Sequence, residues 1–312
     1  MTIPFACPYC GTQTDAYEEY AGQSGPCVVC GKTITVPSPT TVPSSPNRPS
    51  LAPLTPAVRG RSPTTSVLII LTAILGGLLA VFCLLVVLFM VVFPAVSAAR
   101  NNARKTQSAK NLERIAMALR DYEVQYGCFP PAYLADAKGK PLHSWRVLLL
   151  PHLGYQHVYQ QYDFGQSWDS PRNMRLAHLM PTEYACPADP DARTQFETSY
   201  LVVVGDSTLF PGVRCVKAQD IKDGDSETLL VAETPTCGIS WLAPKDLDFR
   251  QMRFEINGKP GFEIGSRHRG GAHVVTADGK SHFLRDGISP EVVQAMTTIQ
   301  GGESIPWSAI EP

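Results

Sequence analysis

Hydrophobic positions are concentrated in one long segment of the chain. No charged residue occurs between Ser62 and Ala99, and the run from Val67 to Phe93 is almost continuously apolar. A helix needs about 20 such residues to cross a bilayer, and a core helix of a soluble protein rarely extends this far without a polar residue. Some sixty residues precede the segment, unlike a cleaved signal peptide. The pattern predicts one transmembrane helix over 66–99, with the lipid bilayer as its partner.

A periodic apolar stripe follows the membrane segment. Its members recur at steps of three and four: Leu112, Ile115, Leu119, Tyr122 and Tyr126. This spacing puts them on one face of a helix. We therefore expect the membrane helix to continue past Pro94, which can kink it, as an amphipathic helix over 100–127. The stripe is too short for a coiled coil, so it should pack on the chain's own domain.

Residues 128–312 alternate short apolar runs with Gly, Pro and Asp turns, a pattern typical of an α+β domain with an antiparallel sheet. We expect strands over 199–204, 227–232 and 252–256. Residues 144–150 and 290–299 have the pattern of helices. The fold class predicted for the whole chain is therefore α+β.

The N-terminal region has a cysteine pattern that suits a metal. Two CxxC pairs, separated by sixteen residues, contain Cys7, Cys10, Cys27 and Cys30. This is the spacing of a structural four-cysteine zinc site, and Gly11 and Gly31 after each pair suit the turns of such a site. Disulfides or a redox CxxC are the competing interpretations. We predict a small zinc ribbon over 1–36 with structural Zn²⁺ as the cofactor.

A proline-rich segment separates the ribbon from the membrane helix. Residues 37–65 contain eight prolines and ten serines or threonines, which cannot bury enough apolar surface to form a core. We expect a disordered, partly extended linker. The net charge of the chain is −1, and no basic run outside the membrane flanks resembles a nucleic-acid patch, so we expect no nucleic-acid partner.

Three of the seven histidines lie in the stretch HRGGAHVVTADGKSHFL, which begins at His268. Asp278-Gly279 between alternating runs predicts a hairpin with a two-residue type I′ turn. That turn would place Val275 opposite His282 and His273 opposite Leu284, with both strand histidines on one face. A structural role is favoured for His268, Asp278 and Gly279, and a metal bound between His273 and His282 stays open. No serine or cysteine has a local sequence that pairs it with a histidine and an acid, so we expect no catalytic residue.

Four further thiols follow the membrane segment, at Cys128, Cys186, Cys215 and Cys237. They would allow two disulfides in three possible pairings if the domain lies outside the cytoplasm. Unpaired buried thiols are an alternative. Cys83, inside the membrane segment, is expected to be an apolar filler.

The order of segments after the membrane resembles a family. The stretches PAVSAARNNARKTQSAKNLERIAMALRDYEVQYGCFPPAY, SWDSPRN, YACPADP and HRGGAHVVTADGKSHFLRDG, within 94–303, are similar to the bacterial domain-of-unknown-function family 1559. Its members are also described as H-x9-DG, pilin-like proteins, and the signature here is His268 followed by Asp278-Gly279. The resemblance implies a type IV pilin or pseudopilin-like shape, in which a long helix, apolar in its first half, is followed by a β-rich domain, here over 128–312. It supplies no established reaction.

The chain departs from prepilins at its N-terminal side. Gly60 precedes Arg61, and the membrane segment contains no acidic residue. The pattern therefore does not predict prepilin cleavage or filament assembly. Basic residues flank both ends of the segment almost equally, so the positive-inside rule decides little. Free thiolates suit a reducing cytoplasm, and pilin-like domains lie outside, which together predict a cytoplasmic ribbon and an extracytoplasmic domain in the inner membrane.

The sequence thus predicts a non-enzymatic, single-pass membrane protein of the cell envelope that acts in assembly or protein interaction, with protein partners and no identified small-molecule substrate. Two alternatives remain. The first is a hydrolase or a solute-binding domain that uses His268, His273, His282 and Asp278. The second is a sensor whose ligand binding outside is transmitted to the ribbon.

Overall fold

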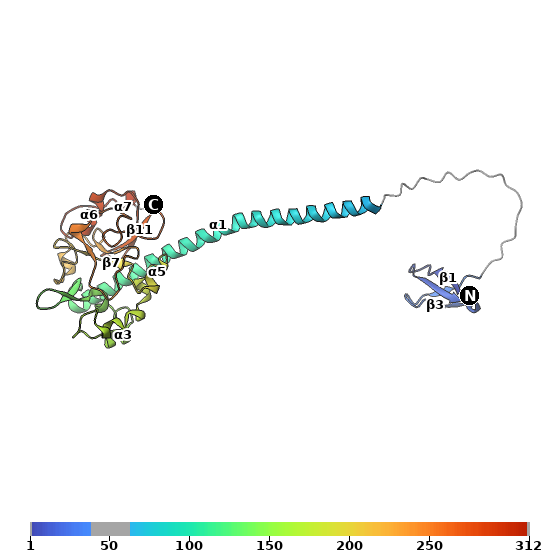
Figure 1. Cartoon of the computed structure of the whole chain (residues 1–312), viewed down its shortest axis with the longest axis horizontal. Coiled ribbons are helices and arrows are strands. Elements are labelled where there is room, and N and C mark those ends of the chain that lie inside the picture. The colour runs from blue at the N-terminus through green and yellow to red at the C-terminus, as the bar shows by residue number, and fades with distance from the viewer. Residues whose placement is uncertain (1, 39–62, 311–312) are drawn as a thin grey trace. The chain divides into compact units, whose positions relative to one another are not determined.

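The computed structural model describes residues 2–38 and 63–310 in two compact units (Figure 1). The expected linker falls mostly outside the described residues. We call residues 2–38 the cysteine unit and residues 127–310 the C-terminal domain. The long helix α1 (Pro63–Tyr126) begins three residues before the expected start of the membrane segment at residue 66. The larger of the two compact units begins inside this helix, at Ile74.

The cysteine unit consists of two antiparallel hairpins. Strand β1 (Thr2–Ala6) pairs with β2 (Gln13–Tyr17), and β3 (Ser24–Pro26) pairs with β4 (Thr33–Thr35). A short 3-10 helix, η1 (Glu18–Tyr20), lies between the hairpins in sequence. Its apolar centre contains little besides Cys7, Cys27 and Ile34, with Phe5 beside them. So small a core rarely stabilises a unit of this size without a further link such as a metal.

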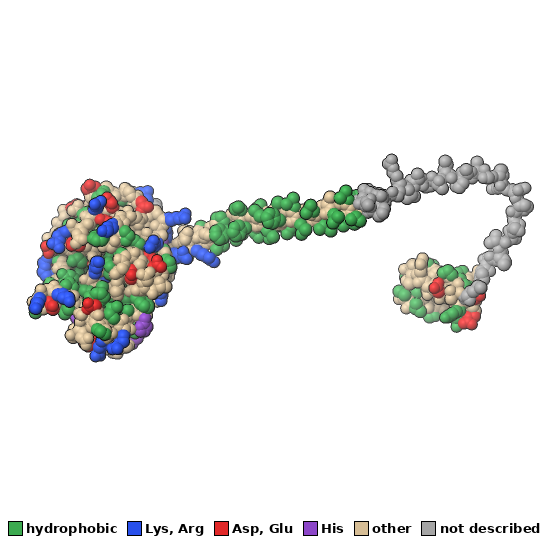
Figure 2. Space-filling model, viewed as in Figure 1, with side chains coloured by type: hydrophobic (Ala, Val, Ile, Leu, Met, Phe, Trp, Pro, Cys, Tyr) green, Lys and Arg blue, Asp and Glu red, His purple; other side chains and the backbone are tan. Residues whose placement is uncertain are grey.

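The first part of helix α1 exposes apolar side chains, and the helix then continues to the C-terminal domain. From Val67 to Phe93 the apolar side chains are exposed, and the span is long and apolar enough to cross a membrane, with a mean hydropathy of 3.1. The helix continues through Pro94 without a break. Figure 2 shows apolar side chains along this segment and basic side chains where the helix meets the C-terminal domain. The predicted continuation beyond the membrane segment is confirmed.

The C-terminal half of α1 packs on the domain through the predicted stripe. Leu112, Ile115 and Leu119 are fully buried, and Tyr122 is partly buried against them. Tyr126 is an exception, because it is 57% exposed and contacts the ring of Tyr122 at the end of the helix. The expected packing of the helix on its own domain is otherwise confirmed.

The centre of the domain is a four-stranded antiparallel sheet of order β12-β11-β9-β7. Its strands are β7 (Tyr200–Leu201), β9 (Leu229–Glu233), β11 (Gly271–Thr276) and β12 (Ser281–Arg285). Two small pairs lie outside it: antiparallel β5 (Tyr133–Ala135) with β6 (Pro141–Ser144), and parallel β8 (Val203–Val204) with β10 (Leu247–Asp248).

Short helices fill the connections of the domain. The α-helices are α2 (Trp145–Leu148), α3 (Gln156–Gln161), α4 (Pro171–Met174), α5 (Pro190–Thr194), α6 (Pro290–Thr297) and α7 (Trp307–Ile310). The 3-10 helices are η2 (Ala177–Leu179), η3 (Thr182–Tyr184), η4 (Ala218–Asp220) and η5 (Phe249–Gln251).

The sheet is covered on both faces. Alternate residues of each strand enter different apolar clusters: Val231 and Val275 pack in the cluster that contains the α1 stripe, whereas Ala232 and Val274 pack in the cluster that contains α6. Burial on both faces explains why the strands are continuously apolar. The sheet therefore lies between α1 and α6.

The predicted strand at 252–256 is wrong. That segment has no regular structure, and Phe254 has a φ of 60°, outside the range of a strand. The run 199–204 forms two short strands, and Val202 between them donates its backbone N–H to Asp246. In the 199–204 run a hydrogen bond to the Asp246 side chain thus interrupts the continuous strand that the sequence pattern predicts.

Asp246 also forms a buried ion pair with Arg146. The two side chains are 2% and 0% exposed, and Nη2 of Arg146 lies 2.5 Å from Oδ1 of Asp246. The guanidinium also donates to Ser144 Oγ at 2.8 Å and to the Tyr200 carbonyl at 3.2 Å. Trp145 Nε1 donates to the same carboxylate. Because both charges are buried, removing one would leave the other in the interior without its counter-ion.

Candidate functional site

The four cysteines of the two CxxC pairs converge in the cysteine unit. Their sulfur atoms all lie within 4.8 Å of one another. Sγ of Cys7 is 3.8 Å from that of Cys30, and Sγ of Cys10 is 3.9 Å from that of Cys27. A tetrahedral ion with metal–sulfur bonds of about 2.3 Å separates its thiolates by about 3.8 Å. The cluster therefore has the dimensions of a four-thiolate metal site.

Both CxxC turns have the same backbone hydrogen bonds. The Gly11 N–H donates to the Cys7 carbonyl at 2.9 Å, and the Gly31 N–H donates to the Cys27 carbonyl at 2.8 Å. Gly11 and Gly31 have φ values of 69° and 71°, which a residue with a side chain rarely adopts. The expectation that a glycine suits the turn after each second cysteine is confirmed.

One thiol of this cluster is readily deprotonated. Thr12 Oγ1 lies 3.3 Å from Cys10 Sγ, and this contact, together with the backbone of Thr12, lowers the pKa of Cys10 to about 6. Only a thiolate binds a metal ion strongly. Cys10 thus supplies a ligand in its binding form near neutral pH.

The hairpin of β11 and β12 exists, but its predicted turn and register are wrong. His273 lies opposite Phe283, and His282 lies opposite Val274. The loop has three residues, and only Gly279, with a φ of 88°, adopts the left-handed conformation in it. This is the geometry of a type I turn followed by a glycine bulge. The carboxylate of Asp278 accepts from the Thr276 hydroxyl at 2.6 Å and from the Lys280 N–H at 3.1 Å, which stabilises the turn.

The shift of one residue separates the two strand histidines. Residues directly opposite each other share a face, so His273 and His282 now lie on opposite faces. His282 stacks on Trp307 with ring centroids 3.8 Å apart, whereas His273 packs against Phe283 at 4.8 Å. A metal bound between these two histidines is therefore ruled out by the register.

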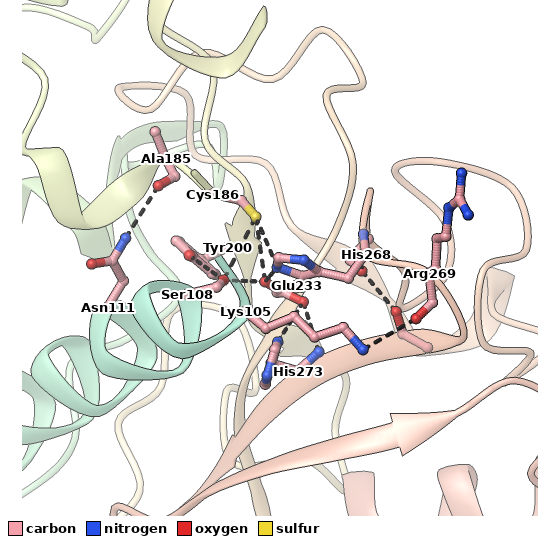
Figure 3. A network of polar contacts seen from close by, with 12 residues as sticks. Lys105, Ser108, Asn111, Ala185, Cys186, Tyr200, Glu233, His268, Arg269 and His273 are labelled. Carbon is pink, nitrogen blue, oxygen red and sulfur yellow. Dashed lines mark hydrogen bonds and ion pairs between the residues drawn. The ribbon is translucent and has the colours of Figure 1, made fainter. Parts of the chain in front are cut away.

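The register brings His273 to a buried carboxylate that the sequence did not point to. Glu233, at the end of β9, is fully buried. Its Oε2 accepts from the backbone N–H of His273 at 2.6 Å and lies 3.3 Å from Nδ1 of the same residue. Its Oε1 accepts from the Ser108 hydroxyl of α1 and lies 3.5 Å from His268 Nε2 (Figure 3). Helix α1 and three segments of the domain meet at this side chain.

Cys186 completes the cluster. Its Sγ lies 3.5 Å from Glu233 Oε1 and 3.5 Å from His268 Nε2. It is also 3.6 Å from Ser108 Oγ, which in turn lies 2.7 Å from the Tyr200 hydroxyl. We call Ser108, Cys186, Tyr200, Glu233, His268 and His273 the Glu233 network. Figure 3 shows these side chains pointing toward one another.

Burial and neighbouring groups shift the pKa values of both acid groups of the network. Burial would raise the pKa of Glu233, but hydrogen bonds from His268 and His273 and their charge outweigh it and lower the pKa to about 2. Burial raises the pKa of Cys186 to about 12, and the Glu233 charge adds to this effect. The network therefore contains a carboxylate in its charged form and, without a further cation, a neutral thiol.

Neighbouring contacts fasten α1 around the network. Asn111 Nδ2 donates to the Ala185 carbonyl at 3.2 Å, and Lys105 Nζ donates to the Arg269 carbonyl at 3.2 Å. On the next turns of the helix, Glu113 accepts from the Ser281 hydroxyl at 2.6 Å. The network is thus the polar part of the helix-to-sheet interface.

The sequence signals for this network were partial. His268 was singled out by its signature, and Cys186 only as a possible disulfide partner. All four thiols after the membrane segment are free, and Cys128 lies beside Cys215. Glu233 could have been suspected, because an acid that directly follows a continuous apolar strand is unusual unless it is paired. Asp278 binds Thr276 and Lys280 within its own turn, and His282 stacks on Trp307, whereas His268 and His273 lie at Glu233. The four residues of the ligand-binding alternative therefore do not form one site.

Comparison with known proteins identifies one part of the chain. Residues 97–209, which include the second half of α1 and the domain as far as β8, match the family described as "Protein of unknown function (DUF1559)". Residues 97–209 belong to this family. The match confirms the family resemblance over that part, and the hairpin with the H-x9-DG signature lies beyond it. No curated protein and no solved structure matches the chain.

Proposed function

We propose that the chain is a non-enzymatic, single-pass membrane protein of the cell envelope whose DUF1559 domain acts in assembly or protein interaction. The observation that supports this most is the construction of α1. Its first part exposes apolar side chains at every turn, and its second part is buried against the domain. A domain built on the end of a membrane helix is held at a fixed distance from the bilayer, since a continuous helix has no joint.

The cysteine unit fits a structural zinc ribbon. Four thiolates fill all positions of a tetrahedral ion and leave none for a substrate, so such a site stabilises a fold rather than a reaction. The unit's apolar centre is too small to stabilise it without such a link. We propose that zinc holds the two hairpins together and that the unit presents a surface to a cytoplasmic protein.

A pilin-like or pseudopilin-like role is supported by the order of elements. A helix that is apolar in its first half and packed on a β-containing domain in its second half follows the plan that the family resemblance implies. In such proteins the apolar half can pack against neighbouring subunits within the bilayer. We propose that α1 contacts another apolar helix along one of its faces.

A cross-linking scan of the membrane helix tests this role. Native Cys83 is exposed on α1 and is used beside Leu84→Cys, Leu85→Cys and Val86→Cys, each in a Cys83→Ser background. These four positions cover one full turn. Oxidation in native membranes should cross-link one face strongly and the opposite face weakly. Absence of cross-links at all four positions would contradict assembly through the helix.

A further inference from the structure

Three atoms of the Glu233 network form a nearly equilateral triangle. Cys186 Sγ, Glu233 Oε1 and His268 Nε2 are each 3.5 Å from the other two. They come from the loop after η3, the end of β9 and the loop before β11. The side chains are almost completely buried. Three ligand-type atoms of different chemistry thus converge on one point from distant parts of the sequence.

We propose that Cys186, Glu233 and His268 bind a second zinc ion, inside the C-terminal domain. Zinc takes sulfur, nitrogen and oxygen ligands at about 2.0–2.3 Å, and a tetrahedral site with these bonds has ligand separations of about 3.3–3.7 Å. The observed separations of 3.5 Å lie within that range. This site is separate from the four-cysteine cluster and does not depend on the function proposed above.

Charge balance favours a dication at this place. A thiolate and a carboxylate together carry two negative charges, which one Zn²⁺ neutralises, so the buried site would be neutral overall. The imidazole of His268 would bind in its neutral form. Without the ion, the thiol of Cys186 contributes only a weak hydrogen bond to the network.

The surroundings of Glu233 suit a metal ligand. One carboxylate oxygen, Oε2, accepts a hydrogen bond from the backbone N–H of His273 at 2.6 Å. The other oxygen, Oε1, is the one that faces Cys186 Sγ and His268 Nε2. Metal-bound carboxylates are commonly hydrogen bonded in this way. Ser108 Oγ, 3.6 Å from Cys186 Sγ, is a further oxygen beside the triangle.

A catalytic cysteine relay explains the geometry less well. In such a relay the imidazole takes the proton of the nucleophile at one ring nitrogen, while the acid accepts a hydrogen bond from the other nitrogen and holds the ring in place. Here the thiol and the carboxylate both face Nε2 of His268. Three ligand atoms that face one another at a common point suit a bound ion better than a proton relay.

The role of the ion would be to fasten α1, through Ser108, to β9 and to the loop before β11.

Metal analysis of the full-length chain tests the proposal. The chain is purified in detergent with Cys7→Ser and Cys10→Ser, which remove half of the four-cysteine cluster. This background should retain about one zinc ion per chain, because the second site is untouched. Adding His268→Ala should lower the zinc content roughly tenfold or more, whereas His282→Ala, on the opposite face of the hairpin, should leave it unchanged.

Cobalt substitution provides a second readout, which reports the thiolate ligand itself. In the background chain, Co²⁺ bound to Cys186 should give a thiolate-to-cobalt charge-transfer band, and Cys186→Ser should remove this band. Variants are compared only after tryptophan fluorescence confirms a folded domain. A folded background chain that contains no zinc and gives no thiolate–cobalt band would overturn the proposal, as would equal zinc contents of the His268→Ala and His282→Ala chains.

Discussion

Leu119→Ala tests whether the apolar stripe of α1 holds the helix on the domain. Leu119 is fully buried among the side chains of the main apolar cluster. The substitution removes three carbon groups, worth about 2.5 kcal/mol at about 0.8 kcal/mol each, and leaves a cavity that adds to the cost. We expect the free energy of unfolding to fall by about 3 kcal/mol, within the range of about 2–5 kcal/mol typical of such changes.

Urea unfolding followed by tryptophan fluorescence measures this change. All four tryptophans lie in the C-terminal domain, and Trp145 and Trp241 are fully buried, so the signal reports this domain alone. The matched control is Met117→Ala on the same helix, where the side chain is 65% exposed. It should cost less than about 0.5 kcal/mol. Equal effects of the two substitutions would refute the docking of α1 through its stripe.

Two further predictions concern stability and use the same assay. Asp246→Ala should cost about 3–5 kcal/mol, because it leaves a buried guanidinium unpaired, whereas Asp206→Ala in an exposed pair should cost less than about 1 kcal/mol; similar costs would contradict the burial argument. Gly271→Ala should destabilise by more than about 3 kcal/mol, since a Cβ there would lie 1.9 Å from the Leu284 carbonyl oxygen. Gly270→Ala meets no atom within 4 Å and should cost only about 1 kcal/mol, from its φ of 86°; an equal cost would argue against the close approach of β12.

The sequence predicted the parts of the fold that depend on local patterns. The uninterrupted apolar run predicted the exposed part of α1, and the 3.6-residue period predicted its buried stripe. The CxxC spacing predicted the cluster of sulfur atoms. Each signal is a property of neighbouring residues. No contact across the domain is needed to detect it.

The hairpin register and the Glu233 network could not be predicted in the same way. Asp-Gly is compatible with a two-residue and a three-residue loop, and the choice between them moves His273 to the other face of the sheet relative to His282. Glu233 and Cys186 are 47 positions apart and meet only because β9 and the loop after η3 are adjacent in space. A local pattern contains no information about such a meeting.

The central claim is that a bilayer separates the cysteine unit from the C-terminal domain. Reporter cysteines at exposed positions test it directly: Tyr17→Cys on β2, where the side chain is 65% exposed, and Val213→Cys in the domain, where it is 55% exposed. Intact spheroplasts are treated with a membrane-impermeant maleimide, and labelling is compared with the parent chain. We predict that Val213→Cys is labelled in intact spheroplasts and Tyr17→Cys only after lysis. Labelling of both reporters before lysis, or of Tyr17→Cys alone, would contradict the account.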